Sequence, residues 1–225
     1  YNTAREGIVI SRMVWDALLY RDPAKNEYLP NLATSYNWVD SKTLEFDLRK
    51  GVTFHNGEKF DADDVVYTLT YISNPENGAK PARNVNWWDS AEKLGDYKVR
   101  LNLTKEFPAA LEFLSGPIVM YPNEYYAEVG PEGMAMKPVG TGPYAVTSVE
   151  PGKRYKFKKN DNYHASSPKG QANIGNITIR TIAESNTQLA ELFSGGVDWI
   201  WKVKPDQAER IASQGQFTVK NASTM

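Results

Sequence analysis

Four short segments of the chain alternate apolar and polar residues with a period of two. They are residues 44–49, 99–104, 155–158 and 177–180, and Gly, Asn, Asp or Pro lies close to each of them. Successive side chains of a β-strand point to opposite faces of a sheet, so this period indicates strands with one face in solvent. Four such strands, spread along the chain, make β-sheet a main component of the fold.

The first residues of the chain carry an apolar stripe at helical spacing. The stripe consists of Ile10, Met13, Val14, Ala17 and Leu18. Because this spacing puts all five side chains on one face of a helix, a helix is predicted over residues 5–19, ending before Pro23.

A second helix is predicted to begin at the acidic run that starts with Asp61. Carboxylates there can cap the free N–H groups of the first turn and interact favourably with the helix dipole. The Asn74-Pro75 pair then ends the helix. Further helices are predicted over residues 108–114, 186–194 and 205–212, and surface loops over residues 74–86 and 130–137.

The charge balance argues against two classes of partner. The chain has 26 basic and 27 acidic side chains, a formal net charge of −1. Nucleic acids and anionic membrane surfaces are bound by basic patches, so neither is expected as a partner. No apolar run approaches the roughly 20 residues of a membrane-spanning helix.

The chain contains no cysteine, which excludes disulfides, thiolate catalysis and cysteine-ligated metal centres. It also lacks the Gly-x-Ser-x-Gly pattern of serine hydrolases. Paired carboxylates of the glycosidase type leave no pattern in sequence, so a hydrolase stays open as an alternative. No catalytic residue is assigned.

The residues that could hold a metal ion have simpler interpretations. The acidic cluster of Glu58, Asp61, Asp63 and Asp64 is interpreted as a helix cap, because it lacks the glycine and the distal glutamate of a calcium loop. The two histidines are far apart in sequence, and His55 is interpreted as a turn or core residue. No metal ligand and no cofactor is therefore expected.

The Gly140-Thr141-Gly142 run is a candidate for binding phosphate through backbone N–H groups. However, Pro143 has no N–H, and residues 144–147 are typical of a strand, whereas a phosphate loop opens a helix. The run is interpreted as a tight turn that holds two subdomains together.

Trp199 and Trp201 are the aromatic candidates for ligand contact. They follow Gly195-Gly196, which is expected to end a helix, and strand alternation would place both rings on one face. Aromatic rings offer a broad contact surface to a bound solute. Core packing remains open as an equal alternative for both.

Four blocks of sequence carry a resemblance to a known family. The longest is residues 48–67, LRKGVTFHNGEKFDADDVVY, and the others are residues 28–36, 138–144 and 192–199. In this order they resemble the dipeptide-, oligopeptide- and nickel-binding family, family 5, of extracellular substrate-binding proteins of ABC importers. Members are about twice as long as this chain, so the resemblance implies an N-terminal portion that has been processed or trimmed.

The resemblance implies an α/β fold of the mixed α+β kind. Its form would be a periplasmic-binding-protein-like lobe with an accessory mixed-sheet subdomain, the second lobe being missing. Residues 1–19 and 148–225 would form an incomplete core subdomain, and residues 20–147 the accessory subdomain. In the family, the stretch just before the first helix touches the ligand backbone, which maps here to Gly7, Ile8 and Val9.

The function implied by the resemblance is solute capture without chemistry. A peptide or similar small solute would bind between two lobes and pass to an ABC permease in the membrane. The protein would be a periplasmic or otherwise extracytoplasmic monomer, associated with the membrane only through its importer. The alternatives are a sensor or regulator lobe derived from such a binding protein, and the hydrolase mentioned above.

Overall fold

The computed structural model describes residues 5–78 and 82–220. The chain divides into two compact units, Tyr1–Ile179 and Arg180–Met225. Within the described ranges, no helix combines the length and the apolar character needed to cross a membrane.

The first unit begins with helix α1 (Arg5–Val14). The predicted end of this helix at residue 19 is wrong, because tertiary partners take over its last carbonyl groups. The Gly142 N–H donates to the Val14 carbonyl at 2.8 Å, and the Lys169 ammonium donates to the Arg12 and Trp15 carbonyls. The chain then forms a hairpin of β1 (Leu19–Asp22) and β2 (Glu27–Pro30).

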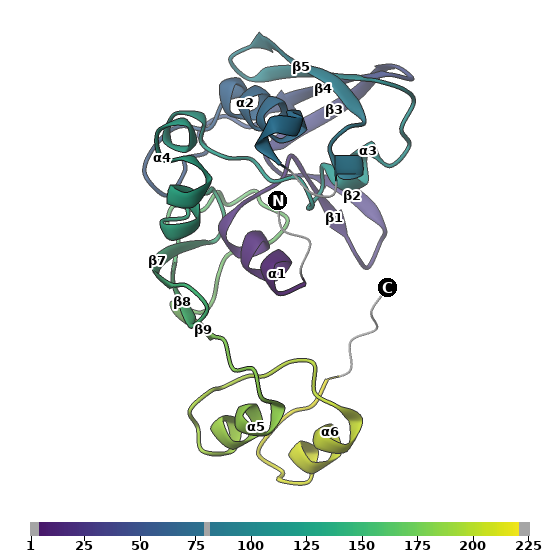
Figure 1. Cartoon of the computed structure of the whole chain (residues 1–225). Coiled ribbons are helices and arrows are strands. Elements are labelled where there is room, and N and C mark those ends of the chain that lie inside the picture. The colour runs from purple at the N-terminus through teal and green to yellow at the C-terminus, as the bar shows by residue number, and fades with distance from the viewer. Residues whose placement is uncertain (1–4, 79–81, 221–225) are drawn as a thin grey trace. The chain divides into compact units, whose positions relative to one another are not determined.

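A four-stranded sheet forms the largest layer of this unit. Its order is β3 (Ala33–Asp40), β4 (Thr43–Leu48), β6 (Lys98–Leu103) and β5 (Trp88–Gly95), and all three pairings are antiparallel. Helix α2 (Ala62–Ser73) packs on one face (Figure 1). The predicted strands over residues 44–49 and 99–104 lie side by side at its centre, and their apolar residues are buried.

The acidic run before α2 caps that helix, as predicted. The Asp63 N–H donates to the Asp61 carboxylate at 2.8 Å, and the Asp61 N–H donates to Asp64 at 2.9 Å. The two bonds form a capping box, which satisfies N–H groups that would otherwise lack a partner. The acids of this run therefore have a structural role.

Shorter elements connect the sheet to the rest of the unit. They are two 3-10 turns (Pro75–Asn77 and Ala82–Asn84), α3 (Ala110–Phe113) and α4 (Asn123–Met136). The loop predicted over residues 130–137 is wrong, because this stretch is helical. Gly130 (φ 65°) breaks α4 for one residue, and Pro131 starts the helix again.

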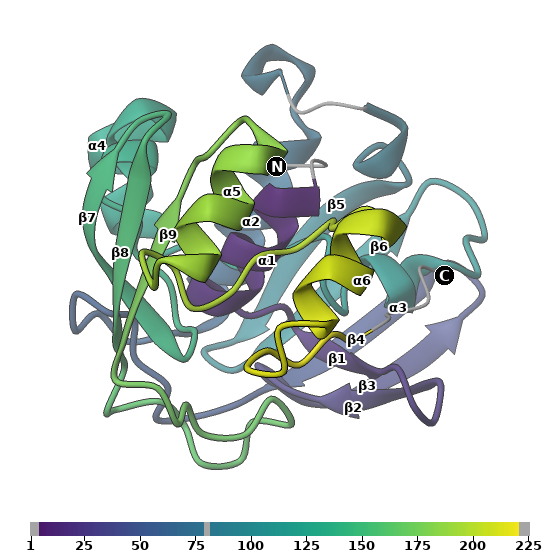
Figure 2. The same cartoon turned by 90° about the horizontal axis from the view of Figure 1, so that it is seen from below.

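The third sheet of this unit contains β7 (Tyr144–Glu150), β8 (Arg154–Lys159) and β9 (Asn176–Arg180). Val14 of α1 packs against Tyr144 and Phe157 of this sheet. In both views α1 lies between this sheet and the four-stranded one (Figure 2). The alternation seen in residues 155–158 and 177–180 thus corresponds to β8 and β9.

The second unit is small and helical. It contains α5 (Ser185–Phe193) and α6 (Pro205–Ala212), and its core consists of the buried side chains of Leu189, Leu192 and Ile211. Gly195, at φ 77°, follows the end of α5 and allows the turn that its sequence predicts.

Candidate functional site

A buried carboxylate lies where α1 ends. Asp16 is fully buried, and its Oδ1 atom is 2.7 Å from the Lys169 ammonium. The Tyr163 hydroxyl donates to Oδ1 at 3.1 Å, and the Thr141 hydroxyl donates to Oδ2 at 3.0 Å. The Asn31 amide completes the set at 3.3 Å.

These donors keep Asp16 ionised in the interior. Burial by itself raises the pKa of this carboxyl, but the Lys169 ammonium and the hydrogen bonds outweigh burial and hold the pKa below its usual range. Removing one partner of a buried ion pair leaves an uncompensated charge, which is strongly destabilising. The cluster thus fixes residues 31, 141, 163 and 169 around the end of α1.

Both histidines border this cluster and are neutral. Burial lowers the pKa of His164, whose Nε2 atom is 4.0 Å from Asp16. Burial also lowers the pKa of His55. The Nε2 atom of His55 is 2.9 Å from the Gly142 carbonyl, and its Nδ1 atom faces the Gly140 N–H at 3.3 Å. Nδ1 therefore accepts and Nε2 donates, so His55 is a turn residue, as predicted.

The two glycines beside Thr141 allow a close crossing over the end of α1. A Cβ atom on Gly140 would stand 2.1 Å from the Val14 carbonyl, and one on Gly142 would stand 2.5 Å from the Met13 carbonyl. Trp15 packs against Gly140 and donates its indole N–H to Val139 at 2.7 Å. These glycines serve packing, and Trp15 has a structural role.

The predicted ligand-contact residues of the first unit lie inside a helix. Gly7, Ile8 and Val9 are all in α1, not before it, so the carbonyl groups of this stretch belong to helical structure. The Ile8 side chain is 38% exposed. Any contact with a solute would therefore come from side chains, or from N–H groups of the first turn.

The two predicted tryptophans lie in the second unit. The strand expected around Trp199 and Trp201 does not form, and this stretch is irregular. The two rings are nevertheless neighbours, with centroids 5.4 Å apart. Trp199 is 69% exposed, so core packing does not account for it.

The sequence interpretation missed Arg12, which lies four residues after Ile8 on α1. The guanidinium of Arg12 lies against Gly116, where an added Cβ atom would stand 3.1 Å from its Nη2 atom. Helical spacing from Ile8 was the one signal that could have singled it out. That no described residue pairs with it depends on tertiary structure and left no trace in the sequence.

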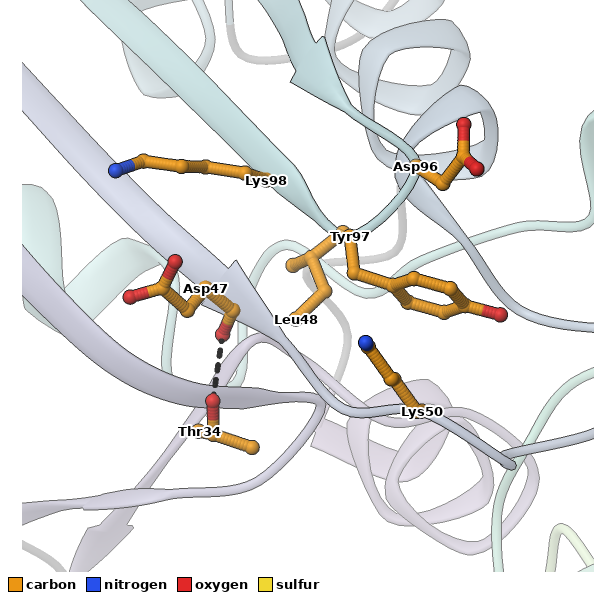
Figure 3. Close-up of a pocket in the computed structure, with 7 residues that line it drawn as sticks. All are labelled: Thr34, Asp47, Leu48, Lys50, Asp96, Tyr97 and Lys98. Atoms are coloured by element: carbon orange, nitrogen blue, oxygen red, sulfur yellow. Dashed lines mark hydrogen bonds between the residues drawn. The ribbon is translucent and has the colours of Figure 1, made fainter.

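Two hollows on the surface of the first unit are lined by residues other than the predicted ones. One, of about 570 Å³, lies beside β4 and β6 and is shown in Figure 3. There the Lys50 ammonium lies 5.4 Å from the centre of the Tyr97 ring, and the Thr34 hydroxyl donates to the Asp47 carbonyl. Another, of about 500 Å³, lies along α2. In residues 5–78 and 82–220, no cluster of three or more potential metal ligands occurs.

Comparison with known proteins gives one consistent result. The family model for bacterial extracellular solute-binding proteins, family 5 (middle region), matches residues 27–225. The glutathione-binding protein GsiB of Pectobacterium atrosepticum is 31% identical over 190 residues, covering 84% of this chain and 36% of that protein.

Solved structures of the same kind share the fold. The oligopeptide-binding protein AppA of Bacillus subtilis, in complex with a nonapeptide, gives a TM-score of 0.78 at 25% identity over 88% of this chain and 40% of its own. NikA of Brucella suis, in complex with Fe(III)-EDTA, gives 0.79 at 30% identity over 96% and 43%. The chain therefore spans less than half the length of these proteins.

Proposed function

Because the chain belongs to the family 5 bacterial extracellular solute-binding proteins, we propose that it is the N-terminal part of a receptor that captures a small solute for an ABC permease. The family match over residues 27–225 is the observation that carries this proposal. In this proposal the receptor is a non-enzymatic, extracytoplasmic monomer.

A peptide or a peptide-like molecule is the proposed solute. GsiB is named for glutathione, AppA was solved with a nonapeptide and NikA with Fe(III)-EDTA. Peptides, glutathione and EDTA all carry carboxylates, so the solute proposed for this receptor is one that carries a carboxylate.

The proposed subdomains keep the boundaries given by the resemblance, residues 1–19 with 148–225 and residues 20–147. Two separate clusters of buried side chains support a division near residues 19 and 147, whereas residues 180–225 form a compact unit with a cluster of their own. One runs from Leu18 to Val139, and the other joins Val14 to Tyr144 and Phe157. Asp16 and Thr141, which are joined by a hydrogen bond, lie in the sequence at the two transitions between these clusters.

The proposed binding residues are Gly7, Ile8, Val9, Trp199 and Trp201. Exposure supports Ile8 and Trp199 in particular, since both present apolar surface to solvent. In the proposal a second lobe, formed by sequence outside residues 1–225, closes over the solute. Closure of this kind is driven by ligand contacts with both lobes.

The proposal is tested by calorimetry on residues 1–225 beside the intact receptor, with glutathione and a tripeptide pool as probes. The intact receptor should bind at least one probe, and residues 1–225 alone should bind it far more weakly because they supply one wall. Equal micromolar affinity in both forms would refute this division of labour. Turnover of a probe would refute the non-enzymatic assignment.

A further inference from the structure

Among the residues that the structure describes, none pairs with the guanidinium of Arg12. Every other arginine whose side chain the structure describes has a partner: Arg21 pairs with Glu112, Arg49 with the Asn31 carbonyl, Arg100 with Glu45, Arg154 with Glu150, Arg180 with Glu191, and Arg210 lies over Phe193. The Arg12 side chain is exposed, and it makes no hydrogen bond or ion pair with any described residue. Its five N–H donors are available.

The position of this guanidinium depends on a glycine. The Nη2 atom would be 3.1 Å from a Cβ atom on Gly116, and Nε would be 3.7 Å from it. A side chain at position 116 would therefore press on the guanidinium. Gly116 thus leaves room for the Arg12 guanidinium, and no hydrogen bond joins the two residues.

No acidic side chain that the structure describes forms an ion pair with Arg12. Lys169 donates to the Arg12 carbonyl, but its ammonium is paired with Asp16 at 2.7 Å. The charges of Lys169 and Asp16 therefore neutralise each other. Among the side chains of α1 that the structure describes, the exposed Arg12 keeps an unpaired positive charge.

Ile8 and Arg12 occupy neighbouring positions on one face of α1. Side chains four residues apart on a helix are adjacent. A solute that touches the exposed Ile8 side chain would therefore reach the Arg12 guanidinium one turn further along.

We propose that Arg12 binds a carboxylate of the captured solute and so selects carboxylate-bearing ligands. This inference rests on the proposed function. The planar guanidinium fork matches a carboxylate with two parallel hydrogen bonds, which the point charge of a lysine cannot reproduce. Gly116 is a positioning residue in this scheme.

The test uses the intact receptor with glutathione, a tripeptide pool, the same pool with C-terminal amides, and inorganic phosphate. Calorimetry should give at least about a tenfold loss of affinity for glutathione or the acid-form pool in Arg12→Gln, because a charged hydrogen bond is lost. Arg12→Lys should lose less. If Arg12 recognises the C-terminal carboxylate, the wild type should bind the amidated pool more weakly than the acid-form pool. Arg12→Gln should then change the affinity for the amidated pool only slightly.

Two matched variants separate this role from general damage. Arg154→Gln removes an exposed guanidinium of β8 that pairs with Glu150, and it should leave binding unchanged. Gly116→Ala should weaken binding by less than Arg12→Gln, whereas Gly95→Ala, where an added Cβ meets nothing within 4 Å, should have no effect. Thermal unfolding of each variant shows whether it is folded.

Each contrary result has a distinct meaning. Unchanged solute affinity in a folded Arg12→Gln variant overturns the role of Arg12 and leaves the proposed function standing. If Arg12→Gln loses only the binding of phosphate, the proposal that Arg12 binds a carboxylate is overturned. Failure of the wild type to bind any probe overturns the proposed function and this inference together.

Discussion

Asp16 illustrates how single residues organise this protein. Its carboxylate faces donors from Lys169, Tyr163, Thr141 and Asn31, which lie far from one another in the sequence. Neither composition nor periodicity could reveal this network, because residue 16 falls inside a predicted apolar helix. The same is true of the exposed guanidinium of Arg12, which pairs with none of the residues in the described part of the chain.

The neutral state of His164 predicts a dependence of stability on pH. Burial lowers the pKa of this imidazole in the folded protein, and the positive charges of Arg49 and Lys169 lower it further. The negative charge of Asp16 acts in the opposite direction but is outweighed. Below the ordinary value of 6.5 the unfolded chain binds a proton that the folded chain does not. The contribution of His164 to stability is therefore complete above that pH and is lost as the pH falls below it.

Urea unfolding from pH 7.5 to 5 checks this expectation. The difference in unfolding free energy between wild type and His164→Gln should shrink on acidification, by up to about 1.4 kcal/mol per pH unit. Burial raises the pKa of Asp64 to about 7 and lowers that of His55, so both groups also make stability depend on pH. Their contributions cancel in the difference in unfolding free energy, because both proteins contain them. A constant difference over this range would contradict the neutral assignment.

At the scale of elements, local pattern predicted what local forces determine. Period-two alternation located β4, β6, β8 and β9, and the acidic cap located the start of α2. The end of α1 was missed because Gly142 and Lys169, distant in sequence, satisfy its carbonyl groups. The second part of α4 was missed because Gly130-Pro131 is typical of a loop, yet here it separates two helical stretches.

The crossing of Gly140 over α1 gives a prediction for these elements. Gly140→Ala should destabilise the protein by about 2 kcal/mol, because the new methyl group would overlap the Val14 carbonyl and the backbone must move. Chemical denaturation measures the effect. Gly175→Ala is the control, since nothing lies within 4 Å of its added Cβ atom. Equal stability of the two variants would contradict the close approach of Gly140 to the Val14 carbonyl.

At the scale of the whole molecule, the two units differ in how much apolar surface they bury. The largest cluster of the first unit includes β4, β6 and α2, whereas the second unit has three buried side chains at its core. Hydrophobic stabilisation scales with the buried apolar area. The helices of the second unit should therefore open more readily than the central strands of the first.

Amide hydrogen exchange on residues 1–225 measures this contrast. Amides of α5 and α6 should exchange well before those of β4 and β6. Amides of α2, which packs on the same sheet, are the internal reference for a protected helix. Comparable protection of α5, α6 and α2 would show that the small core is more stable than its size implies.

The distance in sequence between Asp16 and Lys169 affects how the protein is made. A nascent chain emerges from the ribosome N-terminus first, so Asp16 is synthesised long before the lysine that neutralises it. An aspartate without that lysine resists transfer from water to the interior. The end of α1 should thus stay hydrated and unsettled during translation until residue 169 has been added.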